Sequence, residues 1–277
     1  MRIAYLGYDV LLPCLKALEE SGCSVLELFS FPTDNEFEFN RELRRFAGER
    51  GIPFTERPIG LGDIHRLKAA GCEAVFCAGY LHRVPVDHSL PIVNVHPSLL
   101  PAGRGAWPMP VTILRGLRES GVTLHKMEAR FDTGDILLQR AFPVGPEDNL
   151  EMVTNRVRIV AADLCRRMAA DFDRLWAAGR PQGAGEYWPC PQKPDYTITA
   201  ATPPRETERI LRAFFGFDCY LRTEETEYRI VRGVFRPEPH PGPFGTVELR
   251  PDGTRRYAVR GGVIETAAEG EHKGDEA

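Results

Sequence analysis

Short apolar runs alternate with helix-periodic segments through the first third of the chain, and this alternation limits the fold more than any other feature. The apolar runs predict strands, and the segments between them predict amphipathic helices. We expect strands over residues 2–7, 24–31, 74–78 and 92–95, with helices over residues 10–19 and 39–49. Strands and helices that alternate in this way form a mostly parallel sheet with helices on both faces. The sequence therefore predicts an α/β fold.

Two more strands and a long helix follow this pattern. Residues 121–128 and 135–144 predict two strands, which are joined by the loop that contains Asp132. From Asp148 to Gly179, apolar residues recur every three or four positions. This spacing predicts one continuous helix with a buried face.

The composition changes after Gly179, where glycine and proline become frequent and a connector begins. Beyond it, a helix over residues 205–215 precedes short strands separated by turns, which is typical of a small β-barrel. These strands are expected over residues 219–221, 227–235, 245–250, 257–260 and 263–267. We therefore expect an α/β domain over residues 1–185, a linker over 186–204, a C-terminal β-rich, OB-like domain over 205–268, and a disordered tail over 269–277.

The charge and the cysteines disfavour several classes of protein. The net charge is −4 and the isoelectric point is near 6.0, which argues against nucleic-acid binding through a basic surface. The seven cysteines are scattered, without a Cys-x-x-Cys pair, so we expect reduced thiols and no metal site. The N-terminus lacks a signal-peptide layout, and no apolar run is long enough to span a membrane. We expect a cytoplasmic protein that does not act at a membrane.

Asn94 and His96 stand at the end of the fourth expected strand. Because they are two positions apart, their side chains point to the same side of the sheet. Pro97 cannot donate a ladder hydrogen bond, so the strand ends there. Open α/β sheets bind ligands at the carboxyl ends of their strands. The pair is therefore predicted to face a ligand.

Asp132 supplies a carboxylate that could join this pair. An amide that donates to an oxyanion, an imidazole that handles protons and an acid that orients it are the parts of an acyl-transfer site. Two structural alternatives remain open: His96 is a satisfied structural histidine, and Asp132 only shapes its turn. Asp135 is the better candidate for that turn role.

Four motifs occur in order around these residues: Asn94-x-His96-x-Ser98-Leu99-Leu100-Pro101, Arg104-Gly105-Ala106-x-Pro108, Gly121-Val122-Thr123 and Asp132-Thr133-Gly134-Asp135. Together they resemble the 10-formyltetrahydrofolate-dependent formyltransferases, a family that includes methionyl-tRNA and amino-sugar formyltransferases. The resemblance covers residues 1 to about 180 and implies a Rossmann-like domain. The remainder resembles more weakly the C-terminal barrel of the methionyl-tRNA enzymes, through Ile210-Leu211-Arg212-Ala213-Phe214 and Tyr257-Ala258-Val259-Arg260-Gly261-Gly262.

The resemblance implies a role for each of the three polar residues. Asn94 and His96 would stabilise the oxyanion that forms when an amine attacks the formyl carbon. Asp132 would hold His96 in its charged state and help to remove the proton of the amine. The implied co-substrate is 10-formyltetrahydrofolate, and neither a metal nor a covalent enzyme intermediate is implied.

The family also implies where the folate lies. One segment follows the third strand and consists of Tyr80, Leu81, His82, Arg83 and Val84, and the other precedes the aspartate and consists of Ala129, Arg130 and Phe131. For Tyr80 and Leu81, ordinary packing at a strand end is the alternative.

The amine that accepts the formyl group is less constrained. Where methionyl-tRNA enzymes carry a basic insertion, residues 31–39 are acidic and aromatic and resemble the corresponding segment of sugar-amine formyltransferases. An acidic loop attracts a cationic amine and repels phosphates, which points to a small metabolite such as an amino sugar or an amino acid derivative, and not to tRNA. Asp34 and Asn35 are the candidate contacts, with helix capping as their alternative role.

Further candidate contacts to the acceptor are Tyr8, Asp9, Ser98, Arg104 and Trp107, where Trp107 is either a lid or a packing residue. The alternative functions are methionyl-tRNA formyltransferase and formyltetrahydrofolate hydrolase, and a binding module without chemistry is disfavoured. A homodimer is compatible with the sequence.

Overall fold

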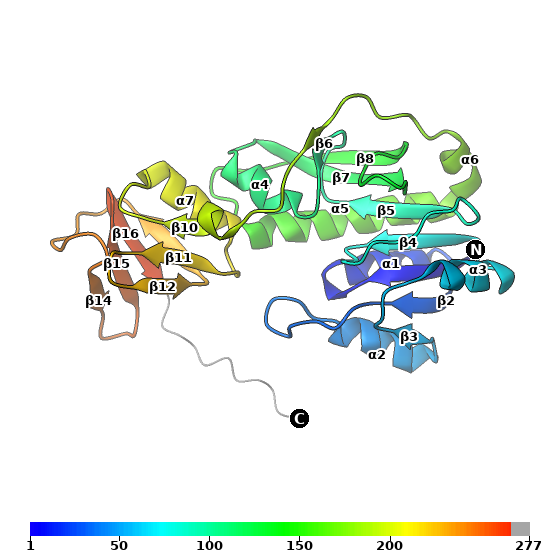
Figure 1. Ribbon diagram of the computed structural model, residues 1–277, viewed down its shortest axis with the longest axis horizontal. Helices are drawn as coiled ribbons and strands as arrows, with labels where there is room; N and C mark the ends of the chain where they lie inside the picture. Colours follow the sequence, from blue (N-terminus) through cyan, green and yellow to red (C-terminus); the bar gives the residue numbers. More distant parts are fainter. Residues whose placement is uncertain (267–277) are drawn as a thin grey trace. The chain divides into compact units, whose positions relative to one another are not determined.

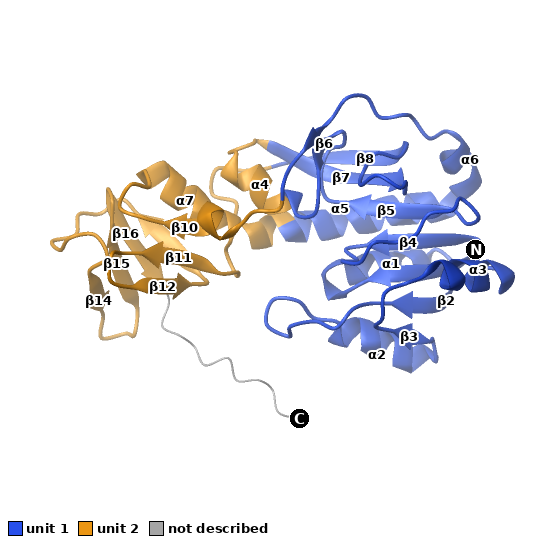
Figure 2. Cartoon of the chain, viewed as in Figure 1, with its two compact units in different colours: residues 1–108, 119–143, 154–189 blue, residues 109–118, 144–153, 190–277 orange. Residues whose placement is uncertain are grey.

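The computed structural model describes residues 1–266, and the tail expected over residues 269–277 lies outside them. The chain divides into two compact units (Figure 2). Unit 1 comprises residues 1–108, 119–143 and 154–189, and unit 2 comprises residues 109–118, 144–153 and the chain from residue 190 onward. The second unit therefore includes two segments from the middle of the chain, whereas the sequence suggested contiguous domains.

Unit 1 contains a seven-stranded sheet in the order β3-β2-β1-β4-β5-β7-β8 (Figure 1). The first four pairings are parallel, and β7 pairs antiparallel with both β5 and β8. The mostly parallel α/β sheet predicted from the sequence is thus confirmed. The strands are β1 (Arg2–Gly7), β2 (Ser24–Phe29), β3 (Phe54–Thr55), β4 (Ala74–Ala78), β5 (Ile92–His96), β7 (Glu119–Lys126) and β8 (Ile136–Pro143).

The helices through the first two thirds of the chain are η1 (Asp9–Leu11), α1 (Leu12–Glu20), α2 (Arg41–Arg50), α3 (Leu61–Ala69), α4 (Pro108–Leu114), α5 (Leu150–Ala170) and α6 (Phe172–Ala177). The sequence did not predict β3, α3 or α4. Strand β3 has only two residues, α3 carries few apolar side chains, and α4 contains two prolines. Neither β3 nor α4 has the apolar periodicity on which the predictions rested, whereas α3 places Leu61, Ile64 and Leu67 at a helical spacing that went unused.

The single long helix expected from Asp148 to Gly179 is wrong. The backbone of Asp171 leaves the helical region, with φ −149° and ψ 49°, and separates α5 from α6. The apolar spacing continues through this break, from Met168 in α5 to Phe172 and Leu175 in α6. Periodicity alone therefore could not reveal it.

Unit 2 is rich in β-structure. Its two sheets have the orders β10-β11-β12 and β13-β16-β15-β14. The expected strand over residues 227–235 is wrong, because it is two strands that belong to different sheets. The OB-like assignment stays a prediction. The elements are η2 (Lys193–Tyr196), β10 (Thr197–Ile198), α7 (Pro204–Ala213), β11 (Cys219–Arg222), β12 (Glu227–Ile230), β13 (Gly233–Arg236), β14 (Val247–Leu249), β15 (Arg255–Val259) and β16 (Gly262–Thr266).

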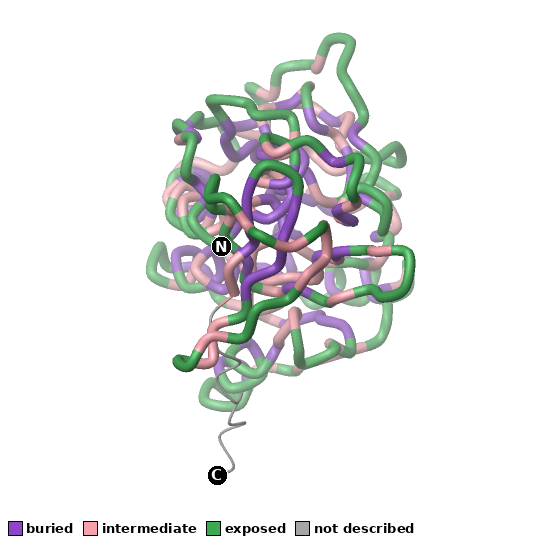
Figure 3. The backbone as a smooth tube through the Cα atoms, turned by 90° about the vertical axis from the view of Figure 1, so that its left-hand side faces the viewer, coloured by how far each residue is buried: buried purple, intermediate pink, exposed green. Residues whose placement is uncertain are grey.

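The start of the predicted linker is part of unit 1. Strand β9 (Glu186–Tyr187) pairs with β6 (Ala102–Arg104). Trp188 is buried, and its backbone N–H donates to the Arg104 carbonyl at 2.7 Å. Buried residues form the central strands, whereas exposed residues follow the peripheral loops (Figure 3).

Gly121 on β7 allows a close approach by the loop after β5. A Cβ atom at Gly121 would lie 2.3 Å from Leu99 Cδ2 and 2.5 Å from the Arg140 carbonyl oxygen. Gly48 in α2 has no atom within 4 Å of the corresponding position. The two glycines therefore differ in whether a methyl group can be accommodated.

We expect Gly121→Ala to lower the free energy of unfolding by about 1–3 kcal/mol through overpacking. Gly48→Ala should raise it by about 0.5–1 kcal/mol, because alanine has the higher helix propensity. Thermal unfolding followed by calorimetry measures both changes. Equal melting temperatures for the two variants would contradict the packing at Gly121.

Candidate active site

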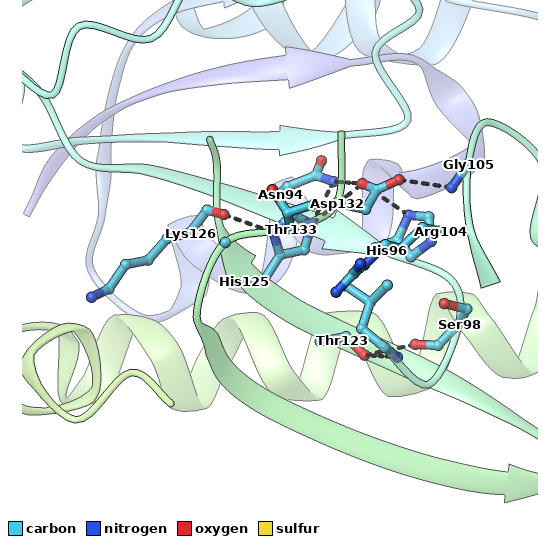
Figure 4. A network of polar contacts seen from close by, with 12 residues as sticks. Asn94, His96, Ser98, Arg104, Gly105, Thr123, His125, Lys126, Asp132 and Thr133 are labelled. Atoms are coloured by element: carbon cyan, nitrogen blue, oxygen red, sulfur yellow. Dashed lines mark hydrogen bonds and ion pairs between the residues drawn. The ribbon is translucent and has the colours of Figure 1, made fainter. Parts of the chain in front are cut away.

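The polar residues of the site come from two paired strands and the loop that follows them (Figure 4). Asn94 and His96 lie on β5, and their antiparallel partners on β7 are His125 and Thr123. Residues directly opposite in such a pair share one face of the sheet. Asp132, from the β7–β8 loop, lies against the same cluster. The structure therefore brings the three predicted catalytic residues together.

The Asp132 carboxylate contacts four groups. Oδ1 accepts from Asn94 Nδ2 at 3.3 Å and lies 3.5 Å from both His96 Nδ1 and His125 Nε2. Oδ2 accepts from the backbone N–H of Gly105 at 2.9 Å. Asp132 has φ +54°, in the left-handed region that aspartate tolerates better than most residues. The backbone thus turns this carboxylate into the cluster.

Asp132 is ionised at neutral pH. Burial by itself would raise its pKa, but the neighbouring imidazoles of His125 and His96 and the hydrogen bond from the Gly105 N–H outweigh burial and lower the pKa below the usual 3.8. These groups hold a carboxylate that is almost fully enclosed by protein.

His96 differs from the sequence-based expectation in its charge. Its Nε2 lies 2.7 Å from the Gly103 carbonyl oxygen. A carbonyl only accepts, so Nε2 carries the proton and Nδ1 faces Asp132. Burial lowers the pKa of His96, and Asp132 offsets this effect only in part. The imidazole is therefore neutral at neutral pH, whereas the family resemblance implied a charged one.

His125 belongs to the cluster, and the sequence analysis missed it. Its Nδ1 donates to the Lys126 carbonyl oxygen at 2.7 Å, which leaves Nε2 to accept from Asn94 Nδ2 at 3.0 Å. Both hydrogens of the Asn94 amide are then directed to His125 and Asp132. His125 lies within the strand that was expected over residues 121–128. Only the register of this strand against β5 shows that His125 is opposite Asn94.

The loop after His96 is held by a hydroxyl group from β7. Thr123 Oγ1 donates to the Ser98 carbonyl oxygen at 2.7 Å and accepts from Leu100 N at 3.2 Å and from Gln139 Nε2 at 2.8 Å. Ser98 Oγ donates to the Ala102 carbonyl oxygen. Ser98 was predicted to contact the substrate that accepts the formyl group. Its hydroxyl is instead hydrogen-bonded within the loop.

The two predicted folate segments meet. Arg83 Nη2 donates to the Ala129 carbonyl oxygen at 3.3 Å. Leu81 in the first segment is 60% exposed and Phe131 in the second is 66% exposed, which is unusual for large apolar side chains. Arg130 is also exposed. A flat aromatic ligand could cover such side chains.

Other residues of these segments are packed. The Tyr80 hydroxyl accepts from the Ile59 N–H, and the rings of Tyr80 and His82 lie near Phe31. Val84 belongs to the hydrophobic core around β4. Packing is thus an observed role for these residues.

Two acidic residues predicted to contact the acceptor cap backbone N–H groups. The Asp9 carboxylate accepts from two residues in the first turn of α2, Glu42 and Leu43. Asp34 Oδ1 accepts from three successive N–H groups of its own loop, at 2.9, 3.0 and 2.9 Å. Asn35 follows with φ +57°. Asp9 therefore caps the start of α2, a role that was not expected for it, whereas Asp34 holds its own loop and does not cap a helix.

The remaining predicted acceptor contacts surround the site in different ways. The ring of Tyr8 lies 5.3 Å from that of Phe31. Arg104 donates to Gln182 Oε1, and Gln182 Nε2 donates to the carbonyl oxygens of Asp132 and Gly134. Trp107 is half-buried.

Within residues 1–266, no group of three or more His, Cys, Asp and Glu side chains could hold a metal ion, and no helix is long and apolar enough to cross a membrane.

Comparisons with known proteins identify the family. The formyl transferase family profile matches residues 62–167. The chain is 34% identical to the methionyl-tRNA formyltransferase of Dehalococcoides mccartyi over 231 residues, which are 78% of this chain and 73% of that enzyme. It is 29% identical to that of Solibacter usitatus over 191 residues, 62% of this chain and only 59% of that enzyme. The chain belongs to the formyl transferase family. It is an enzyme of the folate-dependent formyltransferases, as its motifs predicted.

Solved structures share the fold at low identity. WlaRD, a sugar 3N-formyl transferase, superposes with a TM-score of 0.66 at 16% identity, covering 98% of each chain. HypX from Aquifex aeolicus gives a TM-score of 0.71 at 18% identity, and the match covers 96% of this chain but 43% of HypX. These likenesses extend the shared fold to nearly the whole chain.

Since His96 is buried as a neutral base, stability should depend on pH in a defined way. Below about pH 6.5, the ordinary pKa of histidine, the unfolded chain takes up a proton that folded His96 refuses. The free energy of unfolding should fall as pH drops from about 7 to about 5, and this fall should be smaller in His96→Gln. Asp132, with a lowered pKa, contributes stability that is lost only below about pH 3.8. Urea unfolding of both proteins at several pH values measures the difference, and parallel pH profiles would contradict a neutral His96.

Proposed function

We propose that this enzyme transfers a formyl group from 10-formyltetrahydrofolate to an amine of a small metabolite, such as an amino sugar or an amino acid derivative. The observation that carries the proposal is the convergence of Asn94, His96 and His125 on the ionised carboxylate of Asp132. This arrangement combines hydrogen-bond donors for an oxyanion with bases for an amine proton.

The neutral state of His96 defines its part in the reaction. Nδ1 is free to accept the proton that the attacking amine loses as its nitrogen bonds to the formyl carbon. The resulting imidazolium lies 3.5 Å from the Asp132 carboxylate and stabilises the negative charge on the formyl oxygen. Asn94 donates a second hydrogen bond to that oxygen by turning toward it one of the two Nδ2 hydrogens that are directed to His125 and Asp132 in this structure. When the bond to the folate nitrogen breaks, His96 returns the proton to the leaving nitrogen, and atoms and charge balance.

Asp132 and His125 act as supports. The Asp132 carboxylate favours the charged form of His96 at the moment when the proton arrives. His125 accepts from Asn94 and so determines which atoms of the amide face the formyl group. Because the ring nitrogens of His125 are directed to the Lys126 carbonyl oxygen and to Asn94 and Asp132, we assign it as a positioning residue.

Residues 80–84 and 129–131 are the proposed folate contacts. The exposed side chains of Leu81 and Phe131, on segments joined through Arg83, provide apolar surface for a pterin ring. WlaRD was crystallised with 5-N-formyl-tetrahydrofolate and dTDP, and a HypX structure contains tetrahydrofolic acid. These proteins support a folate donor for this chain.

The acidic loop over residues 31–39 supports a cationic amine as the acceptor. Asp34 and Glu36 are exposed there, and burial together with the charge of Asp34 raises the pKa of Glu38. Methionyl-tRNA is the second candidate acceptor, favoured by the 34% identity to the Dehalococcoides mccartyi enzyme. Hydrolysis of 10-formyltetrahydrofolate, with water as the acceptor, is the third candidate reaction. A turnover assay must distinguish it from transfer to either amine.

Asp132→Asn tests the catalytic site, because asparagine also tolerates the left-handed backbone but carries no charge. We expect kcat to fall at least 100-fold, while the affinity for 5-formyltetrahydrofolate changes less than threefold. Asp135→Asn is the matched control: this neighbouring aspartate pairs with Lys126 Nζ at 3.0 Å, outside the cluster, and the variant should keep activity within a few-fold. Substantial turnover by Asp132→Asn would refute the assignment.

Titration of the wild-type protein with 5-formyltetrahydrofolate by calorimetry tests the donor, and saturable binding to one site is expected. Turnover of 10-formyltetrahydrofolate is then compared with no added amine, with a nucleotide-linked amino sugar and with methionyl-tRNA. We expect the amino sugar to increase turnover most. Turnover that is independent of any amine would indicate a hydrolase, and stimulation by methionyl-tRNA alone would indicate the second candidate.

A further inference from the structure

A small pocket of about 130 Å³ in unit 2 is lined by four arginines. Arg118 follows α4, and Arg205, Arg209 and Arg212 lie on α7. The remaining lining residues are Ile113, Gly116, Leu117, Val144, Gly145, Pro146 and Glu208. Four guanidinium groups against a single carboxylate give the wall a strong positive charge.

Most of this charge is not neutralised by the described part of the chain. Glu208 Oε1 lies 3.7 Å from Arg212 Nε. The side chains of Arg118, Arg205 and Arg209 form no ion pair or hydrogen bond within residues 1–266. Other arginines of unit 2 differ, because each of the following forms an ion pair with a carboxylate: Arg222, Arg229, Arg232, Arg236 and Arg256.

The backbone is shaped around these arginines. Arg205, Arg209 and Arg212 are spaced so that they share one face of α7. Arg212 Nη1 donates to the Asp148 carbonyl oxygen at 2.9 Å, which fixes its guanidinium. Gly116 has φ +63°, and a Cβ atom there would lie 2.3 Å from Arg209 Nη2 and 2.7 Å from its Cζ. Arg209 can reach this position because residue 116 is a glycine.

We propose that this pocket binds a phosphate group. Guanidinium groups match phosphate oxygens with paired hydrogen bonds, and a dianion would relieve the mutual repulsion of the unneutralised arginines. The pocket is smaller than the 300 Å³ or so of sites for drug-sized ligands, so it takes one phosphate and not the molecule that carries it. The phosphate can come from the diphosphate of a small molecule or from the backbone of an RNA. The proposal does not depend on formyl transfer.

The test uses the full-length protein and inorganic pyrophosphate, titrated by calorimetry at low salt. We expect saturable binding to one site, weakened at least tenfold in the double variant Arg118→Gln/Arg209→Gln. The control is Arg222→Gln/Arg232→Gln, which removes the same charge from arginines that pair with carboxylates outside the pocket, and its Kd should stay within twofold. Circular dichroism and thermal melting check that each variant is folded.

Two further arms distinguish the source of the phosphate. Binding of UDP that depends on the pocket arginines indicates a small-molecule diphosphate, and binding of a short single-stranded RNA that depends on them indicates an RNA backbone. If the glutamine variant fails to fold, Arg118→Lys/Arg209→Lys keeps the charge without the paired geometry and should weaken binding at least threefold. The proposal is overturned if none of the three probes saturates, or if binding is the same in the pocket variants as in the control.

Discussion

The buried carboxylate of Asp132 is the group on which the active site depends. Its two oxygens contact side chains of β5 and β7 and the Gly105 N–H of the loop after β5. A carboxylate so enclosed is tolerated only while it is paired and hydrogen-bonded. The groups that keep this charge in place are also those to which the proposed mechanism gives roles in formyl transfer, so each contact would serve both stability and chemistry. Loss of the charge releases the amide and both imidazoles together.

Much of the fold and the centre of the site could be predicted from local sequence. Apolar runs located β1, β4 and β5, and the spacing of Asn94 and His96 placed them on one face. His125 escaped because its role depends on strand register, which is set by pairing between segments distant in sequence. The charge of His96 was mispredicted for a related reason: burial, which no motif encodes, outweighs its carboxylate partner.

The acidic residues near the carboxyl ends of β1 and β2 show how one side chain can have two roles. Asp9 and Asp34 satisfy backbone N–H groups at a helix start and in a loop. Backbone hydrogen bonds from Glu38, Glu36 and Phe37 overcome desolvation and lower the pKa of Asp34, so it remains negative at neutral pH. These local hydrogen bonds therefore keep Asp34 charged, and its negative field is the feature on which the proposed cationic acceptor rests.

The hydroxyl of Thr123 has a thermodynamic consequence for ligand binding. By holding Ser98 and Leu100, it orders the loop beside His96 as part of the folded sheet. Fixing a flexible residue costs about 1–2 kcal/mol of conformational entropy, and here that cost is met when the chain folds. A ligand that enters this site does not have to immobilise the loop, so more of its contact energy is expressed as affinity.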